Sequence, residues 1–104
     1  MANICANKFY IFAESKETLE EIESRLKTLF KEHLDGEITY VFSNCIEGYF
    51  DSRWNFPMDL FEDFFKGIDD DTIYMRCLSE EYGMGLVSMN IYDEGWREPQ
   101  YFDL

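Results

Sequence analysis

Residues that could perform nucleophilic or metal-dependent chemistry are scarce in this sequence of 104 residues. His33 is its only histidine, and it lies near the end of an expected helix among charged and small neighbours. Nucleophilic catalysis needs a serine, cysteine or threonine beside a base, and nothing near His33 in the sequence supports that arrangement. The sequence therefore predicts a surface or helix-capping role for His33, and it assigns no catalytic residue.

The three cysteines form no metal-binding pattern. Cys5, Cys45 and Cys77 are 40 and 32 residues apart, without a Cys-x-x-Cys pair. Structural zinc sites need several closely spaced cysteines or histidines. We predict no zinc site and no cofactor, and we expect buried, reduced thiols of the kind found in cytosolic proteins.

Two further patterns have simple structural interpretations. The run Asp69-Asp70-Asp71 could attract a hard cation, but the spacing of a calcium-binding loop is missing, so we interpret it as a solvated turn. Tyr82-Gly83-Met84-Gly85 contains a Gly-x-Gly that lies between expected strands and opens no helix, which favours a turn over a phosphate-binding loop. A metal-dependent enzyme built on a carboxylate cluster stays open as an alternative.

The acidic residues are distributed unevenly along the chain. The net charge is −13, and residues 58–104 hold twelve acidic and three basic side chains, a net of −9. Dense like charges repel one another, so they serve either solubility or the attraction of a basic partner. They also disfavour direct binding to nucleic acid or an anionic membrane. The candidate partner-binding residues are Asp59, Glu62, Asp63, Asp69, Asp70, Asp71, Glu80 and Glu81.

The elements that would position these side chains follow from hydrophobic periodicity. Apolar residues at three- and four-residue steps predict a helix that Ser15 caps and Asp35-Gly36 ends. A second helix is expected over 58–68, after Pro57. Expected strands cover residues 9–12, 37–43, 47–54, 72–78 and 86–92, with a turn near 44–48, and the tail over 93–104 is expected on the sheet edge. The order predicts one α+β domain over 1–104: a ferredoxin-like (split βαβ) antiparallel sheet with two helices on one face and an added C-terminal strand or tail.

Three short motifs resemble a known family. They are Ala2-Asn3-Ile4-Cys5-Ala6-Asn7, Ser52-Arg53-Trp54-Asn55-Phe56-Pro57 and Glu81-Tyr82-Gly83-Met84-Gly85. In this order they are similar to motifs of the YubB-type ferredoxin-like domains of plasmids, phages and other mobile elements. The sequence departs from that pattern at Ile4, where the family often has tryptophan, and at Phe56, where a second proline is common. The resemblance implies no catalytic residues. We expect Trp54 to pack beneath the second helix, Pro57 to set its start, and Asn3 and Asn7 to bond neighbouring backbone.

These observations lead to one leading expectation and two alternatives. We expect a non-enzymatic acidic binding protein of a mobile element, such as a phage or plasmid, that acts in the host cytoplasm and inhibits a larger host protein by engaging its basic surface. In the concrete version it is anti-CRISPR-like and mimics DNA or RNA in the groove of a nucleic-acid-binding effector. The first alternative is a small-ligand or peptide-binding module that uses a sheet edge or the aromatic residues Trp54, Trp96, Tyr101 and Phe102. The second is the carboxylate-dependent metal enzyme.

The oligomeric state stays open. The sequence has no basic-then-apolar start, so we expect no signal peptide. It has no long apolar run either, so we expect no membrane span.

Overall fold

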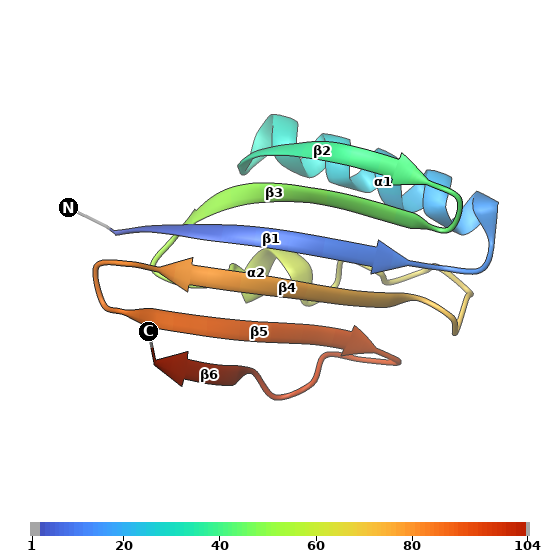
Figure 1. The fold of residues 1–104 in the computed structure, drawn as a ribbon. Coiled ribbons are helices and arrows are strands. Elements are labelled where there is room, and N and C mark those ends of the chain that lie inside the picture. Colours follow the sequence, from blue (N-terminus) through green and yellow to red (C-terminus); the bar gives the residue numbers. More distant parts are fainter. Residues whose placement is uncertain (1–2, 104) are drawn as a thin grey trace.

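The computed structural model describes residues 3–103 as a six-stranded antiparallel sheet with two helices (Figure 1). The strand order is β2-β3-β1-β4-β5-β6. Both helices lie on the same side of the sheet, and the other side has no helix over it (Figure 1). None of the helices within residues 3–103 is long and apolar enough to cross a membrane. The elements are β1 (Ile4–Phe12), α1 (Lys16–Glu32), β2 (Asp35–Phe42), β3 (Cys45–Arg53), α2 (Met58–Phe61), β4 (Tyr74–Glu81), β5 (Leu86–Asp93) and β6 (Gln100–Asp103).

The α+β class, the antiparallel sheet and the two helices are confirmed. The order of six strands differs from that of a ferredoxin-like sheet, so the split βαβ topology is not confirmed. The expectation that the tail lies on the sheet edge is confirmed, because β6 pairs with β5.

Helix α1 begins where the sequence predicts. The Ser15 side chain accepts a hydrogen bond from the backbone N–H of Thr18, which satisfies one of the free donors at the helix start. Its apolar stripe is buried against the sheet through Leu19, Ile22, Leu26 and Leu29. The helix ends earlier than expected, because His33 is its C-cap and β2 starts at Asp35.

Gly36 is therefore a strand residue, and its expected role as the helix terminator is wrong. A Cβ atom at this position would lie 2.6 Å from the Cβ of Phe50 and 2.8 Å from the carbonyl oxygen of Tyr49. Glycine is needed here because β2 and β3 approach each other closely beside the core.

The core lies between the helices and one face of the sheet. Alternate residues of β1 and β4 point into it, among them Phe9, Ile11, Met75 and Cys77, each at most 2% exposed. Phe50 of β3 contacts the ring of Phe61 of α2 in a stacked arrangement, with ring centroids 5.5 Å apart. The period of two along each strand sends the intervening residues to the opposite face.

The second helix is much shorter than expected, since α2 covers only Met58–Phe61. Beyond it the backbone turns through bonds between residues three apart, such as Phe64 N–H to Phe61 C=O at 3.0 Å. The carbonyl of Phe61 also accepts a bond from the indole nitrogen of Trp96 at 2.9 Å. The apolar spacing over 58–68 thus correctly predicts that Phe61, Phe64 and Phe65 are buried. It does not predict the backbone conformation, because contacts with distant residues such as Trp96 favour turns over a continuous helix.

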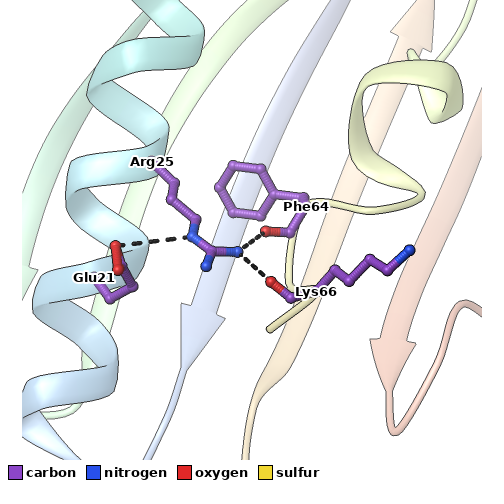
Figure 2. Close-up of polar contacts among 4 residues, drawn as sticks. All are labelled: Glu21, Arg25, Phe64 and Lys66. Carbon is purple, nitrogen blue, oxygen red and sulfur yellow. Dashed lines mark hydrogen bonds and ion pairs between the residues drawn. The ribbon is translucent and has the colours of Figure 1, made fainter. Parts of the chain in front are cut away.

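One arginine joins α1 to this turn segment (Figure 2). The Arg25 Nη1 atom donates hydrogen bonds of 2.8 Å to the carbonyl oxygens of Phe64 and of Lys66. Its Nε atom lies 3.8 Å from a carboxylate oxygen of Glu21, one turn earlier on α1. Arg25 therefore satisfies carbonyls that have no helical partner and fixes the segment against α1.

Several strand boundaries also differ from the sequence prediction. β1 starts at Ile4 rather than at residue 9, and β4 runs over Tyr74–Glu81 rather than 72–78. The turn between β2 and β3 consists of residues 43 and 44, so the expected turn over 44–48 is wrong. Gly48 lies within β3, where a Cβ would meet the ring of Phe9 at 2.6 Å. Strand pairing on both sides extends β1 through its polar residues, which local propensity alone does not favour.

Candidate partner-binding face

The open face of the sheet carries a group of carboxylates that we call the sheet carboxylates. Alternation along the strands places them there, because their sequence neighbours Gly36, Phe50 and Ser79 point toward the helices. They come from β2 and β3, which lie on one side of β1 in the sheet, and from β4, which lies on its other side. The sheet carboxylates are Asp35, Glu37, Glu47, Asp51 and Glu80. Asp93 of β5 also lies on this face by register, but it pairs with Arg97 at 2.8 Å and is not counted among them.

The pairing of β2 with β3 brings two of these charges directly together. Asp35 lies opposite Asp51, and both side chains are exposed. Like charges at directly opposed positions destabilise a sheet. A lysine or arginine at either position would remove this repulsion, yet both positions hold aspartate.

Two tyrosine hydroxyls bond to carboxylates on this side of the sheet. The hydroxyl of Tyr49 donates a 2.8 Å hydrogen bond to Glu37, and the hydroxyl of Tyr82 donates one to Glu80. In each case the hydrogen bond to the carboxylate and its negative charge raise the pKa of the tyrosine. Each tyrosine hydroxyl therefore stays protonated and orients a carboxylate on the open side of the sheet.

A groove crosses this face over β3, β1 and β4. Its volume is about 600 Å³. Three sheet carboxylates line it, together with apolar and aromatic surface and one lysine: Glu47, Asp51, Glu80, Ala6, Leu78, Tyr49, Tyr82 and Lys8. Within residues 3–103, none of the sheet carboxylates lies within ion-pair distance of a lysine or arginine. Arg76 of β4 stacks on the Tyr10 ring, with 4.4 Å between the guanidinium carbon and the ring centroid.

The eight predicted partner-binding residues do not form one surface. Asp69, Asp70 and Asp71 lie near the start of α1, whereas Glu80 and Glu81 lie at the far end of β4 (Figure 1). The eight residues of β4 put about 25 Å between these two groups. Asp59, Glu62 and Asp63 belong to α2 and the turns after it, on the helix side. Only Glu80 lines the groove on the open face.

Besides Glu80, which accepts the Tyr82 hydroxyl, two of these eight residues have contacts that hold the backbone in place. Asp70 accepts hydrogen bonds of 2.6 Å from the hydroxyls of Thr18 and Thr72, and these bonds lower its pKa. Glu81 is only 2% exposed and accepts the backbone N–H groups of Gly83 and Met84 at 2.8 and 2.7 Å. Asp70 thus fixes the connection before β4, and Glu81 fixes the turn after it.

The four aromatic residues of the first alternative do not converge either. Trp96 packs in the helix-side core, 5.5 Å from Phe56 between ring centroids. Tyr101 and Phe102 are neighbours on β6 and therefore point to opposite faces. Trp54 is 49% exposed with a backbone φ of 69°, so its expected place beneath the second helix is wrong. Phe56 takes that place.

The remaining residues of the motifs have mixed outcomes. The α2 helix starts directly after Pro57, as expected. The Asn7 side chain donates to the carbonyls of Cys5 and Phe50, each at 3.1 Å, which confirms its predicted bonding to backbone. Asn3 contributes its backbone carbonyl, which accepts the N–H of Trp54 at 2.9 Å.

The cysteines and the histidine lie apart from the groove. All three cysteines are free, and burial raises the pKa of Cys77 to about 12. His33 is exposed, with its ring nitrogen 3.9 Å from Glu32. In the described part of the chain, no three histidine, cysteine or acidic side chains are grouped so as to hold a metal ion.

Four of the five sheet carboxylates, all but Glu80, are not among the residues that the sequence predicts for partner binding. The signal was the alternation Glu47-Tyr49-Asp51, which places three residues on one strand face. Their face lacks helices only because both crossover segments fold to the other side (Figure 1). In comparisons with known proteins, no family model, curated protein or solved structure matches this chain.

Proposed function

We propose that this protein is a non-enzymatic binding protein that engages a basic surface of a larger protein through the open face of its sheet. The observation that carries the proposal is the groove of about 600 Å³ lined by Glu47, Asp51 and Glu80, none of which forms an ion pair with a residue in the described range 3–103. Cationic groups of a partner would relieve the repulsion between Asp35 and Asp51.

The size of the face favours a protein partner. Five strands of eight or nine residues and the shorter β6, at about 4.8 Å spacing and about 3.3 Å per residue, present roughly 700 Å². This is close to the roughly 800 Å² per partner of a standard protein–protein interface. The net charge of −13 would accelerate the encounter with a basic protein.

The narrower version of the proposal concerns origin and target. The motif resemblance suggests a mobile element, and an inhibitor from such an element would occupy the basic groove of a nucleic-acid-binding effector in the host cytoplasm. The quartet β2-β3-β1-β4 with its connecting helices would then be a ferredoxin-like unit to which β5 and β6 have been added. Competition between this protein and nucleic acid for one effector tests that version.

The experiment compares two variants with the same change of charge. In the first, Glu47, Asp51 and Glu80 are replaced by lysine, and in the second Glu62, Asp69 and Asp71 are replaced by lysine. Immobilised protein captures partners from a host lysate at low and high salt, and binding of the captured partner is then measured with both variants. We expect the first variant to lose at least about tenfold in affinity, equivalent to about 1.4 kcal/mol, and the second to change mainly the association rate.

Two results would overturn the proposal. One is that the variant at Glu62, Asp69 and Asp71 loses as much affinity as the variant on the open face. The other is binding that does not weaken as salt is raised, since screening must reduce attraction between exposed charges. Circular dichroism of both variants confirms that each remains folded.

A further inference from the structure

The two edges of the sheet differ in their protection against pairing with another strand. β6 is a short edge of four residues that follows Pro99. β2 is an edge of eight residues without lysine, arginine or proline. Short length and proline are devices that protect edges, whereas a long unprotected edge offers a row of unpaired N–H and C=O groups. Two carboxylates and one register irregularity are the only such devices on β2, so its longer edge is the more open of the two to strand addition.

The end of β2 is apolar on both faces and exposed. Tyr40, Val41 and Phe42 are 49%, 50% and 60% exposed. The rings of Tyr40 and Phe42 stack on the open face with centroids 5.7 Å apart. A strand laid along this edge would cover apolar surface on both sides of the sheet at once.

The beginning of β2 has a different character. Asp35 and Glu37 point to the open face there, next to Asp51 and Tyr49 of β3. An irregularity in the register between Ile38 and Tyr40 divides this acidic part from the apolar part. The edge therefore distinguishes the two halves of any strand that pairs with it.

We propose that the β2 edge binds an extended segment of the partner protein as an additional antiparallel or parallel strand, with basic residues beside Asp35 and Glu37 and apolar residues beside Tyr40 and Phe42. This inference rests on the proposed function, since it names the part of the basic partner that is recognised. Charge complementarity determines the occupant: the carboxylates of β2 and the net charge of −13 oppose a second copy of this chain. Backbone hydrogen bonds supply affinity in strand addition, and alternate side chains supply specificity.

The test uses synthetic peptides of the length of β2. The first has lysines alternating with threonine in one half and valines alternating with threonine in the other, in both orders. The second has glutamate in place of each lysine. The third keeps the side chains of the first but carries N-methyl groups on alternate residues, which removes backbone donors. Titration by NMR and amide hydrogen exchange report both affinity and the location of binding.

We expect the lysine peptide to protect the amides of β2, and the N-methylated peptide to bind at least about tenfold more weakly because the strand ladder is lost. Matched variants locate the site in the protein. Val41→Lys and Phe102→Lys add the same charge at positions of 50% and 51% exposure on opposite edges. Val41→Lys should reduce binding at least about tenfold, since an edge lysine blocks strand pairing, and Phe102→Lys should leave it within about twofold.

Equal binding of the N-methylated peptide, or equal loss in Phe102→Lys, would overturn strand addition at β2. If the lysine peptide then perturbs Ala6 and Leu78 in the groove instead, the proposed function survives and only this inference fails. Equal binding of the glutamate peptide with protection of β2 would contradict the basic character of the partner in both proposals. Sedimentation of the protein alone as a dimer with protected β2 amides would show that a second copy is the occupant.

Discussion

The hydroxyl of Ser79 on β4 donates a 2.6 Å hydrogen bond to the side-chain carbonyl of Asn7 on β1. The amide nitrogen of Asn7 in turn donates to the hydroxyl of Ser52 at 2.9 Å and to the carbonyl of Phe50 at 3.1 Å, both on β3. Asn7 and Ser79 are 2% and 1% exposed. One buried amide therefore joins three neighbouring strands beneath the groove, and its orientation fixes the strands that carry the sheet carboxylates.

Replacing Asn7 by alanine should lower the free energy of unfolding by about 2–3 kcal/mol, because buried hydroxyl and carbonyl groups lose their partners. Urea denaturation followed by circular dichroism measures this change. Ser79→Ala is the control, and it should cost about 1 kcal/mol because Asn7 keeps its remaining bonds. An Asn7→Ala loss no larger than the Ser79→Ala loss would show that the network does not centre on Asn7.

Arg25 should be the second polar residue on which the fold depends. Arg25→Ala leaves the carbonyls of Phe64 and Lys66 without their donor, so we expect a loss of about 1.5–3 kcal/mol in unfolding free energy. Arg25→Lys should recover only part of it, since a lysine lacks the planar fork of donors. Lys27→Ala is the matched control on the same helix: its exposed pair with Glu23 is worth at most about 0.5 kcal/mol. Similar losses at both positions would contradict the role of Arg25.

Acid should remove the contribution of Asp70 to stability. Hydrogen bonds from Thr18 and Thr72 hold the pKa of Asp70 below its ordinary value of 3.8. A carboxyl with a lowered folded-state pKa stabilises the protein fully above the unfolded-state value, and this stabilisation is lost as the pH falls through the folded-state pKa. Asp70→Asn should therefore destabilise the protein at neutral pH and have a smaller effect below pH 3.8. Thermal unfolding across this range tests it, with exposed Asp71→Asn as a control that should show no such trend.

Gly48 should tolerate no side chain. A Cβ atom would lie 2.3 Å from the carbonyl oxygen of Glu37 and 2.6 Å from the Phe9 ring, so strands β2 and β3 must move apart. We expect Gly48→Ala to cost at least about 2 kcal/mol or to prevent folding. Gly85→Asn is the control: its φ of +67° suits asparagine, and nothing lies within 4 Å of the added Cβ. A stable Gly48→Ala protein with unchanged β2 amide exchange would contradict this close approach.

The cysteines should differ in their reaction with thiol reagents. Burial raises the pKa of both Cys5 and Cys77, the latter to about 12, so their thiolates are rare at neutral pH. Cys45 is only half-buried. Mass spectrometry after brief alkylation should find Cys45 modified first and the other two only after unfolding. Early labelling of Cys77 would show that β4 opens readily.

Much of the local structure follows from the sequence. Ser15 and the apolar stripe from Leu19 to Leu29 determine α1, because a helix start and a buried face depend on residues close together in the chain. Alternation likewise predicts β5, and Pro57 predicts where α2 begins. The acidic composition, with its net charge of −13, is a property of the sequence alone.

Only the tertiary structure decides which acids share a surface. The run from Asp69 to Asp71 and the pair at Glu80 and Glu81 are close in sequence, yet the extended strand β4 separates them. Asp35 and Asp51 are distant in sequence, yet antiparallel pairing of β2 with β3 places them opposite each other. The same long-range packing shortens α2, since Arg25 and Trp96 bond the carbonyls of the turn segment. Charge, periodicity and capping are local properties, whereas register and the choice of the covered face depend on contacts between distant residues.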